Sequence, residues 1–309
     1  MKLRSAFIAF WLLTLAYLGL LFWIDQGRGQ FSAVGDIYAV LPLLLLCTLA
    51  ALLFRFWRWH WLLVRAGFRC NLAPGVLAYF AGFAFTATPG KVGELIRIRY
   101  LQPLGVPAST VISAFVFERA LDLIVVLGIA MLAAWHWEVF PLAAGFVFFA
   151  LTSVVVLARN PALLDRLAEF LRGMHFMRPA HLVDVLKNGL VHAGKWFTPL
   201  DLVVSIALGG LAWGLTAFAF MVLLGHLGVN LPILQSLSLY PAAMLAGAAS
   251  MLPGGIGSTE AVLVTLLAGF AVPLSTGALA AIGIRLATLW FAMLLGIVAM
   301  LLLARTRNL

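Results

Sequence analysis

Two short stretches combine helix-breaking residues with a carboxylate inside otherwise apolar sequence. Residues 89–94 read PGKVGE and residues 253–260 read PGGIGSTE, and an arginine follows each glutamate after 25 positions. Proline and glycine interrupt a helix and leave backbone groups unpaired. Hydrocarbon tolerates such groups only where protein or a water-filled cavity surrounds them. Paired breaks in two halves of a chain indicate a transporter's binding site, whereas two loops that merely turn the chain are the alternative. The two stretches are called the first and second motif below.

The two motifs belong to a longer match within the chain. Val106-Pro107 corresponds to Val272-Pro273, and Ser109-Thr110 corresponds to Ser275-Thr276. This kept spacing predicts a duplication. The expected organisation is one membrane domain over residues 1–309, with the following parts: repeat 1 at about 36–134, a cytosolic linker at about 159–199 and repeat 2 at about 200–303.

Nine charged residues fall at membrane depth once the loops are assigned. They are Lys91, Glu94, Arg97, Arg99, Glu118, Arg119, Asp122, Glu260 and Arg285. A charge at the bilayer centre costs at least ~2.5 kcal/mol, so each needs a partner or a function. Glu118 and Asp122 share one helix face, and Arg119 lies three positions before Asp122. Buried ion pairs that lock the repeats together are the structural alternative to a binding site.

The cations are unequally divided between the repeats. Repeat 1 contains Lys91, Arg97 and Arg99, and the corresponding positions of repeat 2 are the uncharged Gly255, Leu263 and Thr265. The first repeat therefore predicts an electropositive pocket, to which the helix that begins near the first glutamate adds its N-terminal dipole. Arginine suits a phosphate headgroup because it gives bidentate contacts. The predicted substrate-binding residues are Pro89, Gly90, Lys91, Gly93, Glu94, Arg97, Glu118, Arg119, Asp122, Pro253, Gly254, Gly255, Gly257, Glu260 and Arg285.

Composition places these residues in a polytopic, all-α membrane protein. Hydrophobic residues make up 64% of the 309, charged residues 10%, and the mean hydropathy is +1.10, whereas soluble domains carry about 25% charged residues. The net charge of +9 does not indicate nucleic acid, because the basic residues flank apolar runs as the positive-inside rule predicts. The sequence lacks a basic, aromatic-interleaved soluble face for a nucleic-acid backbone.

Six full spans and two re-entrant hairpins are expected. The spans lie at about residues 6–24, 37–54, 110–134, 139–158, 202–224 and 277–303, and the hairpins at about 72–101 and 231–270. If both hairpins dip into the membrane and return, Arg28 is the single cation on the outside and both termini are cytosolic. The hairpins then enter from opposite sides, which predicts an inverted repeat.

Two polar stretches admit more than one interpretation. Residues 55–61, RFWRWHW, read as an interfacial belt with arginines beyond the tryptophan rings, or as a patch that recruits anionic lipid. Residues 159–199 read as one or two amphipathic helices lying on the membrane, or as a plain linker.

No cofactor is expected. The two cysteines, Cys47 in an apolar run and Cys70 in a basic loop, are not expected to form a disulfide in the cytosol. No Cys/His cluster has metal-binding spacing, and no Gly-Lys-Ser/Thr nucleotide motif is present.

The motifs resemble a known family. Residues 89–97 read Pro-Gly-x-x-Gly-Glu-x-x-Arg, residues 118–122 read Glu-Arg-x-x-Asp, and residues 252–260 read Leu-Pro-Gly-Gly-Ile-Gly-x-x-Glu before Arg285. This pattern is similar to that of the flippase-like family, which comprises the membrane domain of lysylphosphatidylglycerol synthase and its stand-alone relatives. Thr86 or Thr88 stands where relatives often have asparagine.

The resemblance implies a bacterial or archaeal protein of the cytoplasmic membrane that moves lipids between leaflets. Relatives are associated with aminoacylated phospholipids, hopanoids or glycolipid carriers. Because the sequence ends at Leu309 without a soluble aminoacyl-transferring domain, we do not expect a synthase. A lipid flippase is expected in which Arg97, Arg119 and Arg285 hold phosphate while Glu94 and Glu260 position these arginines or an amine.

Two other classes remain open from the sequence. One is an intramembrane lipid-modifying enzyme that uses Glu94, Glu118 or Asp122 as acid or base. The other is a membrane partner protein that transports nothing. The expected partners are membrane lipids, with a second copy of the chain and a separate lipid-synthesis enzyme as further candidates.

Overall fold

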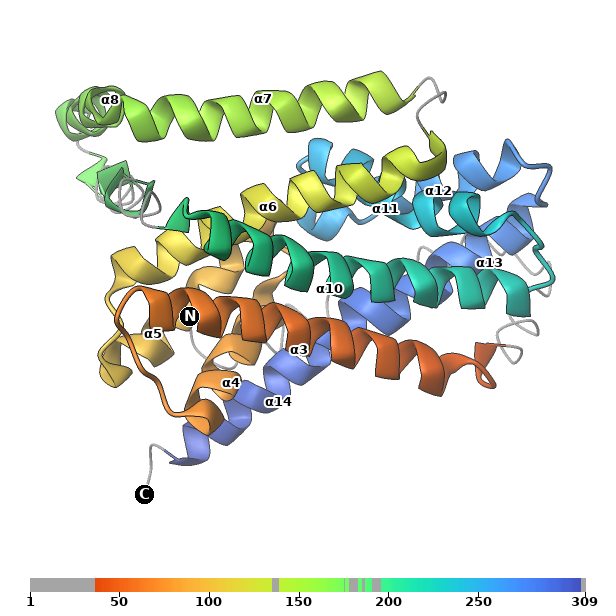
Figure 1. Ribbon diagram of the computed structural model, residues 1–309, viewed down its shortest axis with the longest axis horizontal. Coiled ribbons are helices and arrows are strands. Elements are labelled where there is room, and N and C mark those ends of the chain that lie inside the picture. The colour runs from red at the N-terminus through yellow and green to blue at the C-terminus, as the bar shows by residue number, and fades with distance from the viewer. Residues whose placement is uncertain are drawn as a thin grey trace.

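The computed structural model describes residues 37–134, 139–174, 176–177, 183–184, 187–190 and 196–306. Within these ranges the chain is helical, with no β-strand (Figure 1), which confirms the all-α class. The predicted first span at 6–24 and the aromatic stretch 135–138 lie outside the described residues.

Three helical segments among the described residues are long and apolar enough to cross a membrane. They are α3 (Leu41–Arg65), α10 (Pro199–His226) and the continuous run of α13 (Leu274–Arg285), η7 (Leu286–Trp290) and α14 (Phe291–Thr306). The run contains one π-helical stretch, η7, directly after Arg285. Because π-helical turns inside helices are frequent at functional sites, this part of the run is a candidate region.

There are two further long helices, of which one carries charged residues and the other is followed by a sharp bend. The helix α6 (Ala108–Ala134) has the length of a span, about 40 Å at 1.5 Å per residue, but carries three charged residues. The helix α7 (Val139–Arg159) precedes α8 (Pro161–Gly173), and the axis bends by 85° between them. The two would count as a fourth spanning segment if taken together.

Each motif lies at the break of a helical hairpin. The first hairpin consists of α4 (Leu72–Ala81), η2 (Gly82–Phe85), η3 (Pro89–Ile96), α5 (Arg97–Leu101) and η4 (Gln102–Leu104). The second consists of α11 (Ile233–Ala249), η6 (Pro253–Gly255) and α12 (Ser258–Ala268). The arms of each hairpin pack against one another, so the predicted breaks do reverse the chain.

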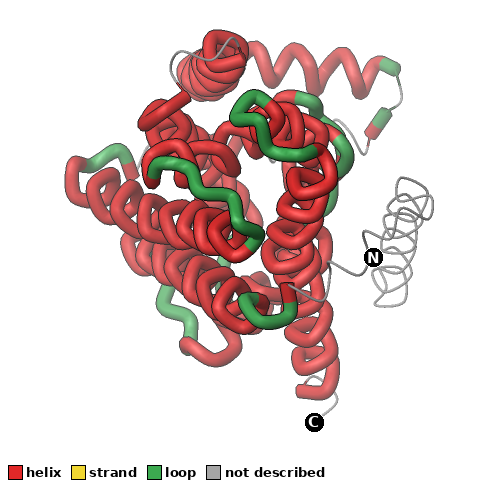
Figure 2. Tube along the Cα trace, turned by 90° about the vertical axis from the view of Figure 1, so that its right-hand side faces the viewer, coloured by secondary structure: helices red, strands yellow, loops and turns green. Residues whose placement is uncertain are grey.

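The two halves of the chain interlock. The helix α3 packs along α10, α6 of the first half packs along α11 of the second, and α14 of the second half packs along α4 and η2 of the first. The packing of α14 is tight, because a Cβ on Gly296 would lie 2.2 Å from the backbone nitrogen of Ala84. Figure 2 shows the helices turned by 90° from the view of Figure 1. The segments η3 and η6, which contain the motifs, are in contact.

The helix α8 has two faces. Leu164 and Ala168 are buried, whereas Leu163, Leu167 and Phe170 are exposed. Ion pairs tie it to the following segment, from Arg172 to Asp184 and from Lys187 to Asp165 at 2.5 Å. A helix therefore forms in the polar region, and its location on a membrane surface stays a prediction.

Candidate functional site

The first motif is a tight turn held by threonine. The hydroxyl of Thr88 accepts a hydrogen bond from the Gly93 N–H at 2.7 Å and donates one to the carbonyl oxygen of Phe85 at 3.0 Å. A Cβ on Gly93 would lie 2.4 Å from that carbonyl oxygen, which explains the glycine. Gly90 and Lys91 both have left-handed backbone angles, with φ of 59° and 57°. Lysine is strained there, since this region costs residues with a Cβ roughly 1–2 kcal/mol.

The second motif repeats this turn with glycines only. Gly254 and Gly255 have φ of 62° and 64°, so Lys91 occupies the strained place that Gly255 takes in the other half. Downstream, Glu260 accepts a hydrogen bond from the Gly257 N–H at 2.8 Å and pairs with Arg285 at 2.8 Å. Arg285 also donates to the carbonyl oxygen of Gly254 at 2.5 Å. The charge of Arg285 is thus neutralised by Glu260 of the same half of the chain.

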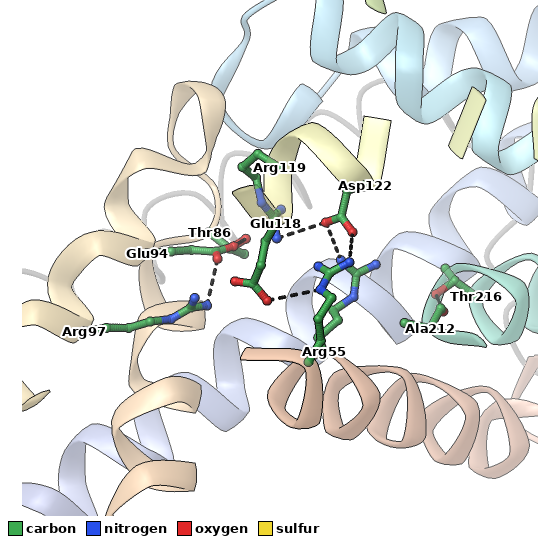
Figure 3. Close-up of polar contacts among 10 residues, drawn as sticks. Arg55, Thr86, Glu94, Arg97, Glu118, Arg119, Asp122, Ala212 and Thr216 are labelled. Carbon is green, nitrogen blue, oxygen red and sulfur yellow. Dashed lines mark hydrogen bonds and ion pairs between the residues drawn. The ribbon is translucent and has the colours of Figure 1, made fainter. Parts of the chain in front are cut away.

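In the first half the glutamate pairs with a different arginine. Glu94 accepts a hydrogen bond from Thr86 at 2.8 Å and another from Arg97 at 2.8 Å (Figure 3). The guanidinium of Arg97 also donates to the carbonyl oxygen of Tyr79 at 3.0 Å and lies 3.9 Å from the centre of its ring. Arg97 is 2% exposed, so its charge is enclosed within the protein.

Three arginines converge on Asp122. Its carboxylate receives Arg58 at 2.8 Å, Arg119 at 3.0 Å and Arg55 at 3.2 Å, as Figure 3 shows for its labelled members. Arg58 also reaches Glu118 at 3.3 Å, and both side chains are fully buried. Three polar atoms of the cluster lack a hydrogen-bond partner among the described residues, namely Arg58 Nη2, Glu118 Oε2 and Arg119 Nε.

The assignment of Arg55 and Arg58 to a solvated interfacial belt is wrong. The helix α3 continues past Phe54 to Arg65, and the two arginines lie on its inner face, 7% and 0% exposed. Their three-residue spacing matches the helical period, so both side chains face α6. Trp57 on the opposite face is 48% exposed and keeps the character of a belt residue.

Two adjoining cavities lie around these charges. The first, of about 90 Å³, is lined by the charged residues Arg55, Lys91, Glu94, Arg119 and Arg285 together with apolar side chains, and is called the charged cavity below. The second, of about 220 Å³, is mostly apolar. Both cavities are lined by Lys91, Arg119 and Gly254, so the strained lysine lies where they meet.

Some of the remaining predicted residues line a cavity and others do not. Gly90, Asp122 and Gly255 line the apolar cavity. Arg97, Glu118, Gly257 and Glu260 line neither cavity. Pro89 and Pro253 begin the helical turns of the two motifs.

A further buried carboxylate was not singled out from the sequence. Asp201 accepts hydrogen bonds from Trp61 and Arg65, both at 2.9 Å, and from Thr198 at 2.7 Å. It ties the beginning of α10 to the end of α3. The available signal in the sequence was Thr198 three positions before Asp201, a spacing typical of the beginning of a helix.

Comparisons with known proteins agree with the sequence motifs. The family model described as the lysylphosphatidylglycerol synthase TM region matches residues 6–296. A UPF0104 membrane protein of Methanocaldococcus jannaschii is 23% identical over 316 aligned residues, which cover 96% of this chain and 92% of the relative. No solved structure matches. Because the family model spans nearly the whole chain, this membrane protein belongs to the family of the lysylphosphatidylglycerol synthase TM region.

Proposed function

We propose that this protein is a flippase or transporter that moves a lipid with an anionic headgroup between the leaflets of the cytoplasmic membrane. The observation that carries the proposal is the charged cavity to which both motifs contribute. It receives Lys91 and Glu94 from the first half and Gly254 and Arg285 from the second. A cavity formed jointly by two broken segments is the usual architecture of a transporter's substrate site.

The cavity lies near the middle of the long helices. Its lining includes Trp213 of α10, Leu289 of the run 274–306 and Arg119 of α6, each close to the midpoint of its segment. Charged groups at the centre of a bilayer are expensive and mark substrate or ion pathways. A lipid headgroup that crosses the membrane needs such polar contacts at mid-depth.

The arrangement of the helices supports an inverted repeat. In that arrangement α3 and α10 correspond, and so do α6 and the run from α13 to α14. The packing is reciprocal, since the last helix of each repeat packs along the first arm of the other repeat's hairpin. The paired left-handed residues of the two motifs correspond as well. Arg55 and Arg58 no longer count as loop cations, but Arg65 and Arg69 still favour a cytosolic location for that end of α3. We therefore propose that both termini are cytosolic.

The contacts suggest a role for each charged group. Lys91 and Arg119 face both cavities and would hold the headgroup phosphate. Arg285, which is held by its ion pair with Glu260, would form another part of the wall of the charged cavity. Arg97 would act indirectly by keeping Glu94 in place, because its guanidinium is already engaged.

The carboxylates favour transport over the enzymatic alternative. Glu94 and Asp122 each form ion pairs with arginines at 2.8–3.2 Å, so both carboxylates are engaged by structural partners, and Glu118 lines neither cavity. A general acid or base instead must lie within hydrogen-bond reach of the substrate proton that it transfers. Lysylphosphatidylglycerol, named in the family's description, carries cationic lysyl amines beside its phosphate, so it is tested next to anionic lipids.

Transport by the purified protein tests the proposal. Liposomes containing the protein and a panel of fluorescent lipids are treated with a quencher that reaches only the outer leaflet. The wild type should make an anionic lipid in the inner leaflet accessible, and the double variant Glu94→Gln with Arg119→Ala should lose this activity. Arg166→Ala, which changes an exposed arginine of α8, is the control. Unchanged transport in the double variant would show that these residues do not form the transport site. Chemical conversion of the lipid would favour an enzyme instead.

A further inference from the structure

We propose that the transported lipid is a phosphomonoester, with a terminal phosphate that carries two negative charges and no further headgroup. This inference rests on the proposed function and narrows its substrate. It depends on the charge, the size and the surroundings of the charged cavity.

The first argument is charge. Of the residues that the structure describes in and directly behind the cavity wall, six are cations and four are carboxylates. The cations are Arg55, Arg58, Lys91, Arg97, Arg119 and Arg285, and the carboxylates are Glu94, Glu118, Asp122 and Glu260. Counted as formal charges, two positive charges are therefore in excess. A phosphate monoester carries about −1.5 to −2 at pH 7 and balances this excess, whereas a phosphodiester carries a single charge.

The second argument is size. The charged cavity, of about 90 Å³, has room for a phosphate group, since about 10–15 Å³ on this measure holds one water molecule. A lysyl group attached to the phosphate would bring cationic charge beside Lys91 and Arg119, which disfavours it.

The third argument is the free hydrogen-bonding capacity at the junction of the cavities. Within the described part of the chain, the ammonium group of Lys91 has no ion-pair partner, and Lys91 lines both cavities. Lys91 has strained left-handed angles, and such strain persists where the surrounding structure or a function requires it. The N–H donors of Lys91 are therefore available for phosphate oxygens.

The fourth argument distinguishes a lipid from free phosphate. The apolar cavity of about 220 Å³ begins at Lys91 and Arg119. It is also lined by Val126 of α6, Phe146 of α7 and Leu245 of α11. A phosphate bound at Lys91 and Arg119 would have hydrocarbon-lined space directly beside it. A ligand with an apolar chain next to its phosphate uses both cavities, and inorganic phosphate uses one.

Binding to the purified protein in detergent tests the inference with matched ligands. Short-chain phosphatidic acid is compared with phosphatidylmethanol, which has the same chains but a methyl ester on its phosphate, and with inorganic phosphate. Phosphatidic acid should bind at least about tenfold more tightly than phosphatidylmethanol, the effect of one lost charge-assisted hydrogen bond. Inorganic phosphate should bind more weakly than phosphatidic acid. Equal affinity for phosphatidic acid and phosphatidylmethanol would overturn the inference, and equal affinity for inorganic phosphate would show an anion site without lipid.

A variant separates charge recognition from a structural role. Lys91→Gly reduces the excess charge from two to one and suits the left-handed backbone. It should reduce the preference for phosphatidic acid over phosphatidylmethanol to less than about threefold, while Arg166→Ala retains the full preference. A preference that survives unchanged in Lys91→Gly would contradict the charge argument.

The liposome assay separates this inference from the proposed function. Transport of phosphatidylglycerol as fast as phosphatidic acid would refute the phosphomonoester preference and leave the flippase standing. Absence of transport for every lipid, with phosphatidic acid still bound selectively, would refute the proposed function instead.

Discussion

Replacing Arg58 by methionine should destabilise the protein by ~3–5 kcal/mol, the usual cost of removing one partner of a buried ion pair. Arg58 and Glu118 are fully buried, and Arg58 is the partner of one oxygen of Asp122 at 2.8 Å. Methionine fills much of the space but leaves Glu118 charged without its arginine. The free energy of unfolding in detergent, from denaturant titration followed by tryptophan fluorescence, gives the effect.

Two further variants test the cause of this loss. Adding Glu118→Gln to Arg58→Met removes the uncompensated charge and should restore part of the stability. Arg65→Met is the matched control on the same helix, because the Arg65 side chain is 43% exposed and Asp201 keeps Trp61 and Thr198 as donors. If Arg58→Met and Arg65→Met had equal effects, Arg58 would not be the centre of the ion-pair cluster.

The variant Lys91→Gly should have opposite effects on stability and transport. Glycine adopts left-handed angles without strain, so the substitution should stabilise the fold by about 1 kcal/mol. Transport of an anionic lipid should fall at least about tenfold, since a charge-assisted hydrogen bond to phosphate contributes roughly 1.5–3 kcal/mol. Thermal unfolding and liposome transport, measured on the same preparation, give both effects.

Lys91→Ala is the companion variant. Alanine removes the charge but keeps the backbone strain, so transport should fall as in Lys91→Gly without the gain in stability. A Lys91→Gly protein that moves lipid at the wild-type rate would show that the lysine is not part of the substrate path.

The sequence predicts the helix breaks at the two motifs well because their signals are local. Proline and glycine interrupt helices through their own backbone properties, and the structure has breaks at both motifs. The pairing of Glu260 with Arg285 was one of the ion pairs that the kept spacing suggested. In the first half Glu94 pairs with Arg97, three residues later on the chain, a spacing that favours contact within one helix.

The role of α3 could not be predicted in the same way. A run of alternating tryptophan and arginine after an apolar stretch is typical of an interface, and composition does not distinguish that arrangement from a continued helix. The helical period gave a signal, because Leu44, Ala51, Arg55, Arg58 and Leu62 all lie on the buried face of α3. The partners Glu118 and Asp122 lie 60 and 64 positions after Arg58, so tertiary packing decides which arginines they meet.

The difference between the two halves carries the functional argument. The predicted duplication would explain the common turns, but it would not explain why lysine stands in place of glycine in a strained position of one motif only. The strained position costs stability, and the ammonium group of Lys91 lies where a charged cavity meets an apolar one. A binding site for the charged end of a lipid accounts for both observations.

The entry of a lipid into the apolar cavity can be measured directly by photolabelling. A phosphatidic acid with a photoreactive diazirine near the top of its acyl chain is added to the protein in liposomes, and its adducts are mapped by mass spectrometry. The helix α7 provides an internal comparison, since Phe146 lines the cavity whereas Phe148 and Phe149 are each 71% exposed.

We predict adducts on Phe146 and on Leu245 that disappear when unlabelled phosphatidic acid is added in excess. Adducts confined to Phe148, Phe149 and other exposed residues, and unaffected by the competitor, would show that lipid only surrounds the protein. That result would contradict the claim that its charged centre receives a lipid.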